Sequence, residues 1–144
     1  MSKIAIVYWS GTGNTEAMAN SVLAGAQAAG AQAELFTAAE FGPEKLAEYD
    51  AAAFGCPAMG AEQLEEDEFE PMFSACKAAL KGKKTALFGS YGWGDGEWMR
   101  NWAERMKNAG AVLVREEGII ANEAPDEEAL EACRAAGEEL AGKA

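Results

Sequence analysis

The segment from Ser10 to Thr15 has the side chains and spacing of a phosphate-binding loop. Hydroxyl and amide side chains stand around two glycines, so hydrogen-bond donors can converge while the backbone approaches an anion closely. An alanine-rich helical segment follows, and its first turn adds backbone amides and the positive end of the helix dipole. The segment therefore predicts an anion site, unless its hydroxyl groups only cap the helix.

The type of phosphate follows from what this loop lacks. A P-loop ATPase has a Lys before its Ser or Thr, and a dinucleotide-binding fold has a third glycine where Glu16 stands. With neither feature present, one terminal phosphate bound through neutral donors, as in a mononucleotide, fits better than a triphosphate with magnesium.

Two later glycine-rich segments, Cys56–Glu62 and Ser90–Gly96, carry hydrophobic side chains where polar turn residues are usual. These side chains are Met59, Tyr91 and Trp93. A flat aromatic ligand would fit between them, with stacking and sulfur–aromatic contacts of about 0.5 to 1.5 kcal/mol each beyond burial. The alternative is that Met59 and Trp93 pack into the core.

Short apolar runs alternate with longer helical segments along the whole chain, which predicts an α/β fold with one parallel sheet covered by helices on both faces. The predicted strands are Ile4–Tyr8, Ala33–Phe36, Ala51–Gly55, Thr85–Phe88 and Ala111–Val114. The predicted helices are Asn14–Ala29, Pro43–Tyr49, Phe69–Leu80, Glu97–Asn108 and Asp126–Leu140. Ligands bind such sheets outside the carboxyl ends of the strands, so the loops after the first, third and fourth strands should converge.

Composition limits the classes of function. The 144 residues are 49% hydrophobic and suit a single domain spanning 1–144. With 12 basic and 24 acidic residues the net charge is −12, which disfavours nucleic acid and anionic membranes and favours basic protein partners. No histidine is present, so imidazole metal sites and His-dependent nucleophiles are excluded. No run approaches the roughly 18 to 20 apolar residues of a membrane span, so we expect a cytoplasmic protein.

Three cysteines and two tryptophans are assigned to packing. Cys56, Cys76 and Cys133 form no CxxC pair, which indicates free thiols in a reducing compartment, and free cysteines are usually buried. Trp98 and Trp102 are four residues apart on a predicted helix and should share its buried face.

Together, three motifs resemble the short-chain flavodoxins of anaerobic, clostridial-type bacteria. The motifs are Ser10–Thr15, the turn Met59-Gly60-x-Glu62 and the run Ser90-Tyr91-Gly92-Trp93-Gly94. The resemblance spans nearly the whole chain. It implies a flavodoxin-like three-layer sandwich with a five-stranded parallel sheet in the order 2-1-3-4-5. It also implies a non-covalently bound FMN, electron transport to reductases and other oxidoreductases, and no catalytic residue or metal ligand.

The resemblance also implies roles for individual residues. The phosphate would lie at Ser10, Thr12, Gly13, Asn14 and Thr15, and the isoalloxazine ring between Met59 and Trp93. Glu62 would accept a hydrogen bond from flavin N3, amides near Gly92 and Gly94 would serve the pyrimidine edge, and Tyr91 would pack near the ring or the ribityl chain. The full set of expected cofactor-binding residues is Ser10, Gly11, Thr12, Gly13, Asn14, Thr15, Pro57, Ala58, Met59, Gly60, Ala61, Glu62, Ser90, Tyr91, Gly92, Trp93 and Gly94. The sequence departs from the family pattern at Pro57, which is a Ser donor in some relatives, and at Ala61, which is polar or acidic in others.

Gly60 is the residue expected to tune the flavin. Rotation of the central peptide in Met59-Gly60-Ala61-Glu62 exchanges a type II′ turn for a type II turn. The resemblance implies that a flipped Gly60 carbonyl accepts the N5 proton of the one-electron-reduced flavin, and a hydrogen bond of about 1 kcal/mol would stabilise the neutral semiquinone. The protein would then cycle between semiquinone and hydroquinone. A Gly60 that only forms the turn would be compatible with binding but not with tuning.

Acidic residues crowd the same loops. If they surround the flavin, the second electron enters a negative field, so the potential is low and a basic partner is attracted; the alternative is an ordinary solvated face. The residues are Glu62, Glu65, Glu66, Asp67, Glu68, Glu70, Asp95 and Glu97.

The main prediction is a monomeric, low-potential one-electron carrier rather than an enzyme. One alternative is an NAD(P)H-dependent flavin or quinone reductase on the same fold, although Trp93 and Met59 would cover both ring faces. A signalling receiver would need an Asp at a central strand end, where Cys56 and Gly89 stand.

Overall fold

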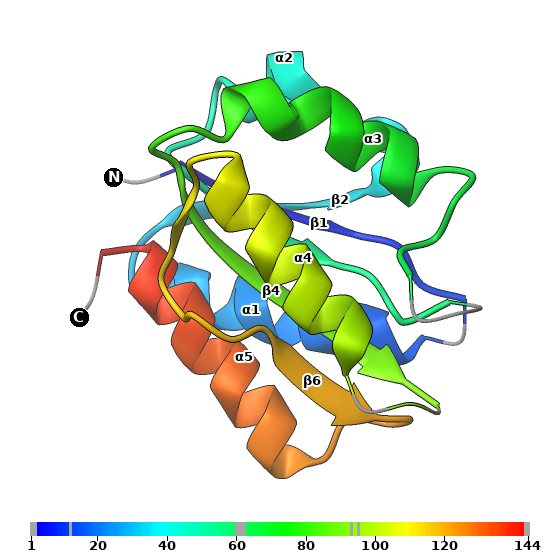
Figure 1. Cartoon of the computed structure of the whole chain (residues 1–144). Coiled ribbons are helices and arrows are strands. Elements are labelled where there is room, and N and C mark those ends of the chain that lie inside the picture. The colour runs from blue at the N-terminus through cyan, green and yellow to red at the C-terminus, as the bar shows by residue number, and fades with distance from the viewer. Residues whose placement is uncertain (1–2, 12, 60–62, 93, 95, 143–144) are drawn as a thin grey trace.

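The computed structural model describes residues 3–11, 13–59, 63–92, 94 and 96–142 of the chain. Within these ranges the strands form one parallel sheet in the order β2-β1-β3-β4-β5, with β6 also paired to β4 (Figure 1). The predicted order 2-1-3-4-5 is confirmed, and a sixth strand is added. The strands are β1 (Lys3–Tyr8), β2 (Gln32–Thr37), β3 (Ala51–Gly55), β4 (Lys84–Tyr91), β5 (Val112–Leu113) and β6 (Ile119–Asn122).

Two short strands share the fifth position of the sheet, which the sequence analysis assigned to one strand at Ala111–Val114. β5 pairs with Lys84 and Thr85 at the start of β4, and β6 pairs with its last four residues, Phe88–Tyr91. The prediction that β4 ends at Phe88 is therefore wrong. Backbone partners on β6 continue the β4 ladder through Gly89 and Ser90, whose residue types are typical of a loop.

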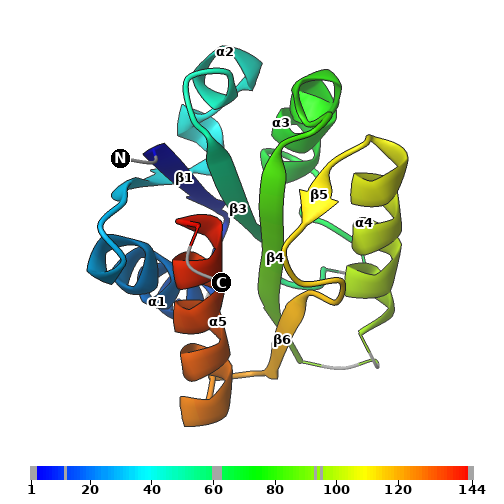
Figure 2. The same ribbon diagram turned by 90° about the vertical axis from the view of Figure 1, so that its left-hand side faces the viewer.

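The helices lie on both faces of the sheet, as expected. Figure 2 shows α1 and α5 on one side and α3 and α4 on the other. Two predicted helices are shorter than expected: Phe69–Leu80 becomes α3 followed by a 3-10 turn at Lys77–Ala79, and Pro43–Tyr49 ends at Leu46. Another 3-10 turn covers Ala38–Glu40. The α-helices are α1 (Asn14–Ala28), α2 (Pro43–Leu46), α3 (Phe69–Cys76), α4 (Glu97–Asn108) and α5 (Glu127–Leu140).

The core is two apolar layers divided by the sheet. Successive residues of β1 enter opposite layers: Ile4 and Ile6 pack with α1 and α5, while Ala5 and Val7 pack with the other helices. The cysteines are free and buried, and Trp98 and Trp102 are buried, so their predicted packing role is confirmed. In the described part of the chain, no helix has the length and apolarity needed to cross a membrane.

Helices α1 and α5 pack backbone to backbone. A Cβ atom at Gly25 would overlap the carbonyl oxygen of Arg134, and one at Gly137 would overlap that of Val22. Any larger side chain at either glycine would force the helices apart. The contact between α1 and α5 therefore leaves no room for a ligand between these helices. The loops at the carboxyl ends of the strands line a pocket instead.

Candidate cofactor site

The segments after β1, β3, β4 and β6 meet around one pocket of about 310 Å³ at the carboxyl edge of the sheet, to the right in Figure 1. The predicted convergence of the first three loops is confirmed, and the segment after β6 joins them. The lining residues are Trp9, Gly11, Asn14, Pro57, Ala58, Met59, Ser90, Tyr91, Gly92 and Glu123. Five predicted site residues lie outside the described ranges: Thr12, Gly60, Ala61, Glu62 and Trp93.

The loop after β1 leads into α1 through a left-handed glycine. Gly13 is the N-cap residue, with φ of 94°, and its amide donates to Ser10 Oγ at 3.0 Å. Glycine has no side chain to accept from the first helical turn, so the alternative of a hydroxyl N-cap is not what the structure has at this position. Asn14, the first residue of α1, lines the pocket, so the positive end of the helix dipole lies beside it, as an anion site requires.

Thr15 and Ser90 join α1 to β4 beneath the pocket. The Ser90 amide donates to Thr15 Oγ1 at 3.3 Å, and the two hydroxyl oxygens are also 3.3 Å apart. Both residues are buried, and Ser90 also lines the pocket. The Thr15 hydroxyl is thus engaged with β4, and what Thr15 offers an anion is its backbone amide in the first turn of α1.

The described residues after β3 lie beside β4. Met59 and Gln63 exchange backbone hydrogen bonds of 2.8 and 3.0 Å, and the Ala58 amide donates to the Ser90 carbonyl at 3.1 Å. These bonds place half-buried Met59 at the pocket wall.

Tyr91 ends β4 and forms another wall. Its ring centroid lies 5.6 Å from that of Trp98, at an interplanar angle of 48°. The Trp98 indole in turn donates to the Cys56 carbonyl at 3.1 Å. Tyr91 therefore packs on a tryptophan whose ring is held by a hydrogen bond.

Trp9 and Glu123 are pocket residues that the sequence analysis did not assign to the site. Trp9 was counted only as the end of an apolar run, yet its indole lies against Gly11, where a Cβ atom would come within 3.3 Å of the ring. Glu123 alone among the described non-glycine residues has a positive φ, 57°, and its amide donates to the Tyr91 carbonyl at 2.7 Å. Strained backbone of this kind is enriched at functional sites, but no sequence pattern announces it.

The acidic residues near the pocket are of two kinds. Glu66, Asp67, Glu68 and Glu97 are exposed, as is Glu123, which lines the pocket. Glu65 and Glu70 are instead held by hydrogen bonds within the fold. Glu62 and Asp95 lie outside the described residues.

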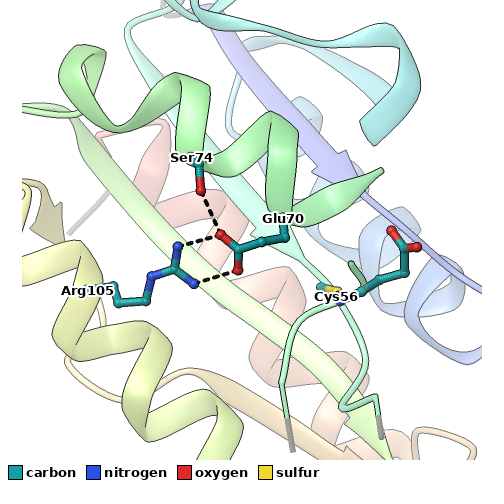
Figure 3. Close-up of polar contacts among 5 residues, drawn as sticks. Cys56, Glu70, Ser74 and Arg105 are labelled. Atoms are coloured by element: carbon teal, nitrogen blue, oxygen red, sulfur yellow. Dashed lines mark hydrogen bonds and ion pairs between the residues drawn. The ribbon is translucent and has the colours of Figure 1, made fainter. Parts of the chain in front are cut away.

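Glu70 and Glu65 have structural partners. The Glu70 carboxylate accepts from Arg105 at 2.8 and 2.6 Å and from Ser74 at 2.7 Å, which joins α3 to α4 (Figure 3). The Arg105 guanidinium lowers the pKa of Glu70. Burial would raise the pKa of Glu65, but amide donors from Phe69, Glu68 and Asp67 outweigh it and hold that pKa below its ordinary value.

These residues fit FMN. Hydroxyl, glycine and helix-terminal donors without a lysine or arginine in the lining suit a single phosphate, and the walls formed by Trp9, Met59 and Tyr91 suit a flat ring. A second pocket of about 310 Å³ lies between α4 and the 116–120 segment. Its lining includes Arg100, Glu104 and Glu117 but no hydroxyl-rich loop or aromatic side chain, so it does not suit the same ligand.

Comparison with known proteins gives the same family as the motifs. The flavodoxin family model matches residues 6–137. Flavodoxin from Megasphaera elsdenii is 50% identical over 123 residues, 85% of this chain and 88% of the relative, and flavodoxin from Clostridium beijerinckii is 48% identical over 122 residues with the same coverage. The solution structure of two-electron-reduced M. elsdenii flavodoxin superposes with a TM-score of 0.85 at 45% identity, covering 96% of this chain and 98% of the other.

Proposed function

The chain belongs to the flavodoxin family, and from that premise we propose that it carries single electrons between larger redox enzymes through FMN bound at the carboxyl edge of the sheet. The observation that carries the proposal is one pocket shared by the hydroxyl-rich loop before α1 and by the segments of Met59 and Tyr91. When bound, the flavin supplies the chemistry of taking up and releasing electrons one at a time. The protein is an electron carrier, like its flavodoxin relatives, rather than an enzyme.

The residues proposed to hold the phosphate are those of the loop after β1. Gly13 turns the backbone, Asn14 lies at the pocket, and the amides that open α1 supply donors without a positive side chain. The full phosphate set is Ser10, Thr12, Gly13, Asn14 and Thr15, and Gly11 is the other proposed cofactor contact in this loop.

The ring is proposed to lie between Met59 and Trp93, beside Tyr91. The chain excludes water there with apolar side chains and offers backbone groups at the ring edges. Gly60 is proposed to turn its carbonyl toward the reduced ring, and Glu62 to accept from N3. The remaining proposed contacts are Pro57, Ala58, Ala61, Ser90, Gly92 and Gly94.

The partners are proposed to be reductases and oxidoreductases with basic docking surfaces. A net charge of −12, the exposed Glu123 in the pocket lining and the exposed carboxylates of Glu66, Asp67 and Glu68 support this charge complementarity. The same negative field supports a low potential for the second electron. We propose a reducing cytoplasm because the three cysteines are free, and a monomer as the default state.

Titration of the apoprotein with FMN, followed by anaerobic stepwise reduction under visible spectroscopy, tests the proposal. We expect one FMN per chain and two successive one-electron steps with a blue, N5-protonated first stage. Failure to bind added FMN would refute the site. Direct bleaching in a single two-electron step, together with steady NADH oxidation, would instead favour the reductase.

A further inference from the structure

Cys56 directly follows β3 and forms hydrogen bonds with three other segments. Its amide donates to Phe88 of β4 at 3.1 Å, its carbonyl accepts from Trp98 of α4 at 3.1 Å, and its sulfur accepts from the amide of Glu65 at 3.3 Å. The residue is fully buried. Glu65 is therefore fixed at its backbone to a residue that is itself bonded to β4 and α4.

The Glu65 side chain folds back onto its own segment. It is 6% exposed, and its carboxylate accepts from the amides of Asp67, Glu68 and Phe69, each at 2.8 Å. The carbonyl of Glu65 also accepts from the Glu70 amide at 2.8 Å. One buried carboxylate thus sets the backbone from 65 to 69, where no side chain of the N-cap residue Glu68 caps α3.

Both ends of this segment reach the cofactor pocket. On one side, only Leu64 separates Glu65 from Gln63, and Gln63 exchanges backbone hydrogen bonds with Met59. On the other side, the backbone of Glu68 is set by Glu65, and the Glu68 carboxylate accepts from the Trp9 indole at 3.0 Å. Met59 and Trp9 are both pocket walls.

We infer that Glu65 is a positioning residue of the site: its carboxylate, without touching the cofactor, fixes the backbone that holds the paired Met59 and Gln63 and the Trp9 wall in the geometry that binds FMN. The inference rests on the proposed function. It assigns Glu65 to loop positioning rather than to the negative field around the flavin. It also predicts that the pocket walls are ordered before the cofactor binds.

The first test compares FMN dissociation constants of apoprotein variants. Glu65→Gln replaces one acceptor oxygen with an amide NH2 group and removes the charge, so we expect the affinity for FMN to fall about tenfold. Asp67→Asn removes the same charge from an exposed neighbour, and Leu140→Ala destabilises the core at the far end of α5; both should retain wild-type affinity. Equal losses in Glu65→Gln and Asp67→Asn would show that charge matters and positioning does not. Wild-type affinity in Glu65→Gln would also overturn the inference.

A second test uses only the wild-type chain and does not depend on a variant folding. We expect the amides of Asp67, Glu68 and Phe69 to be protected from hydrogen exchange in the apoprotein, with little further gain on adding FMN. Protection that develops only with FMN would mean that the cofactor orders the segment, and would overturn the inference. If the wild-type apoprotein binds no FMN, the proposed function itself fails, which separates that outcome from the others.

Discussion

The indole nitrogen of Trp9 donates to Oε1 of Glu68 across 3.0 Å, joining the loop after β1 to the start of α3 over 59 positions of sequence. Trp9 lines the pocket through the same ring whose nitrogen is held in this bond. The two loops that bound the pocket on this side are therefore joined by this contact between side chains.

Loss of this contact should weaken FMN binding. Trp9→Phe keeps an aromatic wall but removes the donor, and because the bond is exposed we expect only about a fivefold rise in the dissociation constant. Glu68→Gln keeps an acceptor oxygen and serves as the matched control, with affinity near wild type. Fluorescence titration of both apoproteins measures the difference; a larger loss in the control would mean that charge, rather than the indole contact, is responsible.

Gly13 should be needed for its conformation rather than for space. Its φ is 94° and a Cβ atom would contact nothing within 4 Å, so Gly13→Ala costs about 1 kcal/mol of backbone strain. Gly30→Ala is the matched control, with φ of 92°, equally open surroundings and a place at the opposite end of α1. Urea unfolding should show similar losses in both, while FMN titration should show weaker binding in Gly13→Ala alone. Equal FMN affinity in the two variants would contradict the assigned role of the loop.

Gly89 should tolerate no side chain. A Cβ atom there would overlap the carbonyl oxygen of Cys56, the same oxygen that accepts from Trp98, so Gly89→Ala should lower the free energy of unfolding by about 2 to 3 kcal/mol. Gly92 lines the pocket, but a Cβ atom there has nothing within 4 Å, so Gly92→Ala should unfold at the wild-type urea concentration. A stable Gly89→Ala protein would contradict the close approach of β3 and β4 seen here.

Stability should fall in acid because two glutamates are held in their charged form. The pKa values of Glu65 and Glu70 lie below the ordinary 4.5, so the folded state binds fewer protons than the unfolded one. Their contribution is complete above about pH 4.5 and is lost as the pH falls through the lower folded values.

Thermal melting of wild-type and Glu70→Gln apoproteins between neutral pH and about pH 3 measures this effect. We expect Glu70→Gln to melt lower at neutral pH, since Arg105 loses its partner, and to change less on acidification. Glu104→Gln, an exposed charge on α4, is the control and should follow the wild-type curve. Parallel curves for Glu70→Gln and wild type would exclude a role for the ion pair.

The sheet could be predicted from the sequence where strands are buried on both faces. β1 and β3 have continuous apolar runs and were placed to within one residue. The strands at the fifth position of the sheet could not be predicted in this way. They lie at the sheet edge, where β6 alternates buried and exposed residues over only four positions. The true end of β4 depends on β6, since the partner strand and not the local residue types keeps Gly89 and Ser90 extended.

The site could be predicted where residue type alone carries the chemistry. Glycines and hydroxyl groups identify the loop before α1. Met59 and Tyr91 stand out because they are hydrophobic residues in glycine-rich segments where polar residues are usual. Glu65 and Glu70 were grouped with their acidic neighbours, as a field around the flavin or a solvated face; their amide and guanidinium partners come from the folded chain. Trp9 and Glu123 belong to the pocket through tertiary contacts that no local pattern encodes.

The backbone contact between α1 and α5 has a consequence for biosynthesis. Gly25 lies against residue 134 and Gly137 against residue 22, so the part of α1 that faces α5 is covered by a helix made more than a hundred residues later, while α1 also packs on the sheet. A nascent chain would carry that side uncovered until α5 has left the ribosome. The α1 surface around Val22, Gly25 and Ala26 is then where a chaperone would act during synthesis.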